Sequence, residues 1–161
     1  MKTVKKRSQL QEKSVAKSFN AKQVVASGAL WGAKGDVRND KYLFECKTTE
    51  KDYYTITTKV WEKIEEEALK DRMRTPLLIV DLRDTDRYVV FNPNHFIRQV
   101  GSLNDKFPHV HGGFKSYLFR GYKEDLPIVF SIMSIKNPKK HHVLMIMKVK
   151  DFVEYFKEEL S

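Results

Sequence analysis

Three residues in a short stretch of the sequence, Asp36, Glu45 and Lys47, are of the types that hydrolyse phosphate esters. Two carboxylates can hold a hard divalent cation through oxygen, and such a cation neutralises phosphate charge and lowers the pKa of a bound water. An ammonium group beside them can orient the attacking water and stabilise negative charge in the transition state. These residue types therefore favour Mg²⁺-dependent phosphodiester hydrolysis, provided that the fold brings them together.

A β-hairpin is the element expected to do so. Two extended segments, 36–37 and 42–47, flank Asn39-Asp40, which suits a tight two-residue turn. Alternate residues of a strand share a face, so Glu45 and Lys47 are neighbours. With this turn Asp36 pairs with Leu43, and Glu45 becomes its diagonal neighbour on the same face. A register change of one residue would destroy this arrangement.

A helix predicted over Ser8 to Phe19, with Ser8 as its N-cap, adds a third carboxylate. Glu12 precedes Val15, Ala16 and Phe19 by three, four and seven residues, which places it on the inward face. Two interpretations stay open at this point. Glu12 either lies at the edge of the apolar stripe, reaching solvent or a core lysine, or it joins the two hairpin carboxylates.

Composition indicates one globular domain with a polyanionic partner. The chain has 161 residues, with 30 Lys and Arg against 21 Asp and Glu, a formal charge of +9. Lys5, Lys6 and Arg7 form a basic start that suits either a nucleic-acid arm or a solvated terminus. The single cysteine, Cys46, and the lack of a long apolar run predict a cytoplasmic protein that neither enters a membrane nor is secreted.

The remaining elements predict an α/β fold, with a central mixed β-sheet flanked by helices. The segment 57–69 is an amphipathic helix that should cover the sheet. Strands are expected over 77–82, 87–91, 128–135 and 143–149, and a closing helix should begin near Asp151. The segment 92–125 gives no clear pattern.

Other chemistries fit poorly. His109, His111, His141 and His142 are not accompanied by a Cys pair or a helical His-x-x-x-His, so we expect no zinc site. No phosphate-binding loop of the Gly-x-x-x-x-Gly-Lys-Ser/Thr type occurs, so no nucleotide cofactor is expected. The Cys46 thiol points away from Glu45 and should pack in the core.

The stretch Gly35-Asp36, then 37–44, then Glu45-Cys46-Lys47 resembles the bipartite motif of the PD-(D/E)XK nuclease superfamily. With Glu12 and the Ser27-Gly28 loop, it is most similar to archaeal-type Holliday junction resolvases, including virus-encoded relatives. The resemblance covers about residues 8–91. It implies one nuclease domain over 1–161, with a restriction-endonuclease-like core at 8–91 and a C-terminal elaboration at 92–161. Gly35 departs from the nominal proline.

This resemblance also implies roles for individual residues. Glu12, Asp36, Glu45 and Lys47 would be catalytic, and Glu12, Asp36, Glu45 and the main-chain carbonyl of Cys46 would bind Mg²⁺, for which Mn²⁺ should substitute. Contacts with DNA are expected from Lys5, Lys6, Arg7, Ser27, Lys34 and Arg38. The resemblance further implies a homodimer that cuts four-way DNA junctions symmetrically. It also implies a location in the cytoplasm of a prokaryotic or virus-infected prokaryotic cell.

Two alternatives remain beside a junction resolvase. One is a nuclease of the same fold that acts on linear or modified duplex DNA and uses the same site. The other is a non-catalytic DNA-binding module, in which Asp36, Glu45 and Lys47 form only a charged hairpin. The region beyond Asn92 is longer than a minimal resolvase needs, which leaves the substrate class open.

Overall fold

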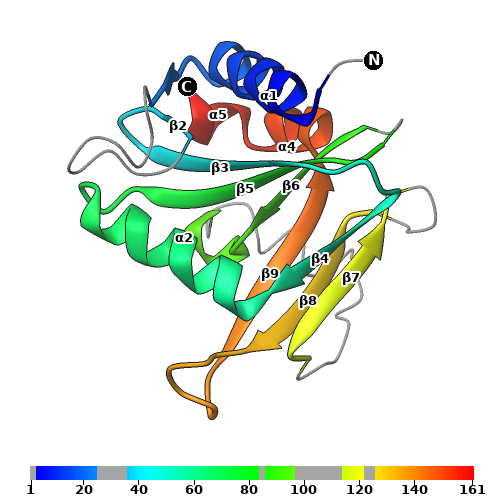
Figure 1. The fold of residues 1–161 in the computed structure, drawn as a ribbon. Coiled ribbons are helices and arrows are strands. Elements are labelled where there is room, and N and C mark those ends of the chain that lie inside the picture. The colour runs from blue at the N-terminus through cyan, green and yellow to red at the C-terminus, as the bar shows by residue number, and fades with distance from the viewer. Residues whose placement is uncertain (1–2, 25–35, 84–85, 97–113, 122–125) are drawn as a thin grey trace.

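The computed structural model describes residues 3–24, 36–83, 86–96, 114–121 and 126–161 (Figure 1). Its elements along the chain are α1 (Val4–Ser18), β1 (Lys22–Gln23), β2 (Val37–Arg38), β3 (Tyr42–Thr48), β4 (Tyr53–Thr57), α2 (Thr58–Lys70), β5 (Thr75–Asp81), β6 (Arg87–Phe91), the 3-10 helix η1 (Pro93–Phe96), β7 (Ser116–Arg120), β8 (Ile128–Met133), β9 (His141–Lys148), α4 (Val149–Tyr155) and α5 (Lys157–Leu160).

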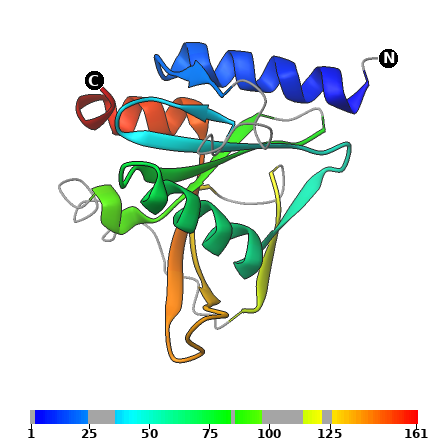
Figure 2. The same cartoon turned by 60° about the vertical axis from the view of Figure 1, so that its left-hand side comes forward.

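A seven-stranded sheet is the centre of the described structure, with the order β1-β2-β3-β5-β6-β9-β8. Strands β3 and β5 are parallel, whereas their neighbours pair antiparallel. A two-stranded sheet pairs β4 with β7. Helices α1 and α4 lie on one face of the large sheet and α2 on the other (Figures 1 and 2). The prediction of an α/β fold with a mixed central sheet flanked by helices is confirmed.

Helix α1 begins four residues earlier than predicted, because its N-cap is Thr3. The Thr3 hydroxyl accepts a hydrogen bond from the Lys6 backbone N–H at 3.3 Å, and Ser8 lies inside the helix. The basic residues after Thr3 carry no apolar signal, so the spacing could not reveal this first turn. The inward face was predicted correctly, since Val15 and Phe19 are buried between α1, α4 and the sheet.

Helix α2 matches its prediction within one residue at each end. The Thr57 hydroxyl caps it by accepting from the Val60 backbone N–H at 3.2 Å. Trp61 and Ile64 are buried in the second core cluster, which lies on the face opposite α1. The apolar stripe read from the sequence therefore covers the sheet as expected.

A buried carboxylate joins α2 to the β8–β9 hairpin. Glu62 is 9% exposed and accepts hydrogen bonds from the Ser134 hydroxyl at 2.6 Å and the Ile135 backbone N–H at 3.0 Å. The Nε2 atom of His142 lies 2.9 Å from the same carboxylate oxygen. With these partners Glu62 is tolerated in an otherwise apolar layer, and it ties two segments more than 70 residues apart.

The four strands predicted after α2 are confirmed as β5, β6, β8 and β9, and the closing helix α4 begins at Val149 instead of Asp151. Strands β4 and β7 were not predicted. In this pairing Tyr53 lies opposite Arg120, and β7 belongs to the segment 92–125, whose sequence gave no clear pattern. No helix in the described ranges is long and apolar enough to cross a membrane.

Candidate active site

The turn of the β2–β3 hairpin lies one residue later than predicted, at Asp40-Lys41. The side-chain oxygen of Asn39 accepts hydrogen bonds from the backbone N–H groups of Lys41 (3.0 Å) and Tyr42 (2.8 Å), which stabilises this turn. Arg38 therefore pairs with Leu43, so each β2 residue lies opposite a β3 residue two positions farther along than predicted. A shift of two positions keeps side chains on their predicted faces.

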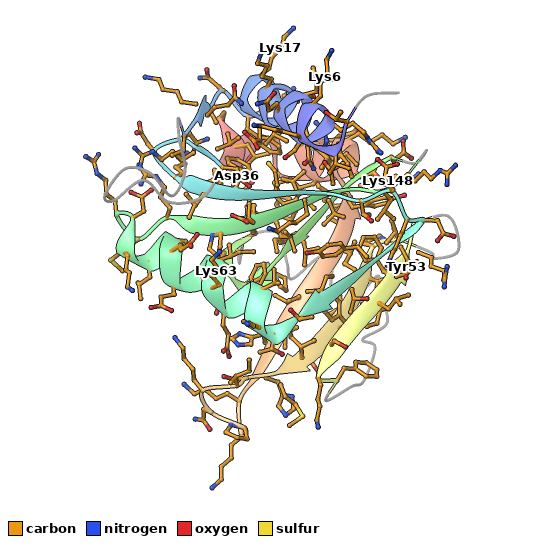
Figure 3. The ribbon with its side chains drawn as sticks, viewed as in Figure 1. Lys6, Lys17, Asp36, Tyr53, Lys63 and Lys148 are labelled. Carbon is orange, nitrogen blue, oxygen red and sulfur yellow. The ribbon has the colours of Figure 1, made fainter. Side chains whose placement is uncertain are left out.

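Asp36 lies beside β3 at the start of this hairpin (Figure 3). Its backbone N–H donates to the Phe44 carbonyl at 3.0 Å. Its carboxylate Oδ2 accepts a hydrogen bond from the Cys46 backbone N–H at 2.8 Å. Two contacts with β3 thus hold the carboxylate next to the stretch that contains Glu45 and Lys47.

Glu45 and Lys47 share one face of β3, as predicted. The Lys47 Nζ lies 3.0 Å from Glu45 Oε1, and the side chains are 40% and 14% exposed respectively. Phe44 and Cys46, which alternate with them, are buried in the core on the α1 side. The strand alternation therefore separates a polar pair from the packed face that supports it.

Burial and neighbouring carboxylates raise the pKa of the Asp36 carboxyl group. Burial first, and then the charges of Glu45 and Glu12, raise the pKa of Asp36 to about 6, against the hydrogen bond from Cys46 and the charge of Lys47. Burial lowers the pKa of Lys47, but its hydrogen bond and attraction to Glu45 outweigh that effect and leave the pKa raised. At neutral pH the site therefore contains an ammonium group among mutually repelling carboxylates.

Glu12 approaches this group from α1 and is half-buried. Its two carboxylate oxygens face the Ser8 hydroxyl at 3.4 Å and the Gln23 amide Nε2 at 3.3 Å. In the described ranges no lysine pairs with it. Glu12 acts electrostatically on both Asp36 and Cys46, so the first helix carries this carboxylate toward the hairpin, as its inward position indicated.

Sequence analysis missed Gln11, which is 2% exposed. Its amide Nε2 donates to the Lys47 carbonyl at 2.9 Å, and its Oε1 accepts from the Thr48 hydroxyl at 2.8 Å. Gln11 therefore fixes α1 against the strand segment that carries Lys47. Its position four residues before Val15, in the apolar stripe, was the available signal.

The other predicted site residues have mixed positions. Lys5 and Lys6 are exposed on α1, and Arg7 forms an ion pair with Glu50. Arg38 pairs with Asp71 at 3.1 Å. Ser27 and Lys34 lie outside the described residues. The Cys46 thiol is buried, and burial followed by the nearby carboxylates raises its pKa, in agreement with a packing role.

The donor atoms suit a hard divalent cation. Asp36, Glu45 and Glu12 supply carboxylate oxygens. The pKa of Asp36 is raised by burial and, in addition, by repulsion from the other carboxylates, and a cation would relieve that repulsion. The part of the chain that the structure describes contains no preformed group of three His, Cys, Asp or Glu side chains able to hold a metal. Lys47 contacts Oε1 of Glu45, so a cation would be bound through the other oxygen of this carboxylate or in exchange for the ammonium group.

Comparison of the chain with protein-family models, curated proteins and solved structures gave no match.

Proposed function

We propose that this protein is a Mg²⁺-dependent DNA endonuclease with a restriction-endonuclease-like core, and that it resolves four-way junctions as a homodimer. The observation that carries the proposal is the convergence of Asp36, Glu45 and Lys47 at one hairpin, with Asp36 held by the Cys46 N–H. Glu12 on α1 and the formal charge of +9 support it. The junction as substrate rests on the family resemblance.

Each residue has a separate task in this proposal. Asp36 and Glu45, with Glu12 and the Cys46 carbonyl, would hold the cation. When bound, it would neutralise phosphate oxygens and lower the pKa of a coordinated water. Attack of a water on phosphorus would break the bond to the leaving oxygen, with the proton of the water released to solvent and the leaving oxygen protonated from solvent. Lys47, protonated because of its carboxylate neighbour, stabilises the additional negative charge of the transition state.

The test is single-turnover cleavage of a four-way junction, a linear duplex and a single strand in Mg²⁺. We expect paired nicks in the junction and much slower cutting of the other two substrates. Asp36→Asn and Glu45→Gln should lose cleavage by at least about a hundredfold and retain junction binding in Ca²⁺. Asp40→Asn is the matched control, because it makes the same chemical change at an exposed position in the hairpin turn.

Three outcomes would contradict different parts of the proposal. Near-normal cleavage by Asp36→Asn or Glu45→Gln would remove the assigned site. Equal or faster cutting of linear duplex would retain the site and change the substrate to that of a restriction-type or repair-type nuclease. Binding without metal-dependent cleavage of any substrate would leave only a DNA-binding module.

A further inference from the structure

Three lysines on the outer side of α1 lie on one line. Lys6, Lys13 and Lys17 are seven and four residues apart, and at 100° per residue Lys13 and Lys17 each fall within about 20° of Lys6 around the helix axis, on either side of it. All three are exposed, and Figure 3 shows Lys6 and Lys17 pointing away from the sheet. We call Lys6, Lys13 and Lys17 the α1 lysine line.

This line has no part in holding the helix to the protein. The buried residues of α1, Gln11 and Val15, lie about 140° and 180° around the helix from Lys6, on the side that faces the sheet. Glu12 lies about 120° from the line, toward the candidate active site. One helix therefore presents a carboxylate to the site and a row of cations to the exterior.

The lysine line also has no carboxylate partner among the residues that the structure describes. Helix α2 differs, because its Lys63 and Lys70 pair with carboxylates four residues away, at 3.9 Å and 2.7 Å. Two of the three lysines of α2 are thus matched by carboxylates within the helix. Those of the α1 lysine line are left for solvent or for another molecule.

The placement of Lys6 and the spacing of Lys13 and Lys17 oppose the stability of the helix, although the helix dipole favours Lys17 in the last turn. The first turn of α1 has no acidic residue, although the helix dipole favours negative charge there, and Lys6 lies at that positive end. Lys13 and Lys17 are four residues apart, a spacing at which like charges repel. Unfavourable local choices without a partner inside the protein are the pattern expected at a binding surface.

We infer that the α1 lysine line binds the phosphate backbone of a DNA duplex, at a surface separate from the cleavage site. The line extends roughly 16 Å along the helix axis, a length over which duplex DNA presents about five phosphates per strand. The contact has no base specificity, because lysines read phosphate charge alone. It deepens the proposed function, on which it rests for the identity of the ligand, by placing one duplex arm of the substrate along α1.

The test measures binding without cleavage, by fluorescence anisotropy of a labelled linear duplex in chelator over a range of salt concentrations. The variant Lys6→Gln/Lys13→Gln/Lys17→Gln keeps side chains that favour helix. It should lose affinity by about a hundredfold at low salt, and its log affinity against log salt slope should be shallower by about 2–3. The thermal midpoint should stay the same or rise.

The matched control removes the same charge from the opposite end of the molecule. Lys136→Gln/Lys139→Gln/Lys140→Gln changes the turn between β8 and β9, which lies far from α1 in both ribbon views (Figures 1 and 2). Its loss of duplex affinity should be less than about threefold. An equal loss in both variants, or no loss in the α1 variant, would overturn the inference.

Two further measurements distinguish DNA binding by the α1 lysine line from membrane binding and from cleavage at the candidate active site. Tighter binding to vesicles of phosphatidylserine and phosphatidylcholine than to duplex, dependent on the same lysines, would overturn DNA as the ligand. Asp40→Asn should bind duplex as the unchanged protein does, because this exposed residue lies outside the line and outside the candidate active site. If the unchanged protein cleaves none of the DNA substrates but the α1 variant still loses duplex affinity, the nuclease proposal fails and this inference holds.

Discussion

Removing the negative charge of Asp36 should stabilise the metal-free protein at neutral pH. Burial and the neighbouring carboxylates raise the pKa of Asp36 to about 6 from its ordinary 3.8, so the folded state holds its proton more tightly than the unfolded state does. The contribution of this group to stability is therefore full below about pH 4 and is lost as the pH rises through about 6. Asp36→Asn does not titrate, and its amide oxygen can still accept from the Cys46 N–H.

The size of the effect follows from the shift. A difference of about two pKa units corresponds to an upper limit of ~3 kcal/mol. Because the carboxylate is still partly exposed, solvent screening reduces this to about 1–2 kcal/mol. The free energy of unfolding of Asp36→Asn should therefore be about 1–2 kcal/mol higher than that of the unchanged protein at pH 7.5. At pH 4 the two free energies should be nearly equal.

Urea denaturation in chelator at these two pH values measures the difference, and Asp40→Asn serves as the exposed control. Saturating Mg²⁺ should then reverse the order, because the unchanged protein gains about 2–3 kcal/mol from a ligand at a hundred times its dissociation constant, whereas the variant has lost a ligand group. The reasoning is refuted if Asp36→Asn is less stable in chelator at pH 7.5, or if Asp40→Asn gains as much.

Three further predictions concern the support, the chemistry and the assembly of the site. Gln11→Ala should lower the free energy of unfolding by about 2–3 kcal/mol, because it removes buried hydrogen bonds to Lys47 and Thr48; a loss under about 0.5 kcal/mol in urea would contradict this. Lys47→Ala should slow single-turnover cleavage by about a hundredfold or more with little change of junction affinity in Ca²⁺, and a near-normal rate would exclude its transition-state role. Sedimentation should give about twice the chain mass of 18.9 kDa, and a monomer that nicks both junction strands in one encounter would argue against the dimer.

The sequence predicted the shared face of the site better than its register. Strand alternation alone brings Glu45 and Lys47 together, and this holds wherever the turn lies. The turn itself depends on whether Asn39 uses its side chain to accept from the next backbone N–H groups or enters the turn, a choice between nearly equivalent local structures. The site survived that error because a one-residue move of the turn shifts the pairing by two.

Features set by contacts distant in sequence could not be predicted. Strand β4 has one buried residue, Ile56, and so lacks the apolar run that marks β6, and its partner β7 comes more than 50 residues later. Gln11 is a polar residue within an apolar stripe, and the carbonyl to which it donates belongs to another element, so its role could not be predicted locally. The pKa of Asp36 likewise depends on Glu12 from a separate helix. Local pattern gives elements and faces, and tertiary structure gives the partners of buried polar groups.

The hydrogen bonds of Glu62 have a consequence for the order in which the chain matures. The hairpin with Asp36 and the helix α2 leave the ribosome long before Ser134 and His142, which supply the buried carboxylate with its partners. His142 belongs to β9, which lies between β6 and β8 and is the last of the described strands to be synthesised. In a nascent chain the whole β2–β3 hairpin is therefore synthesised before α2 can pack against the β8–β9 hairpin. Contacts between segments so distant in sequence form slowly. The described sheet can therefore be completed only after β9 has been synthesised.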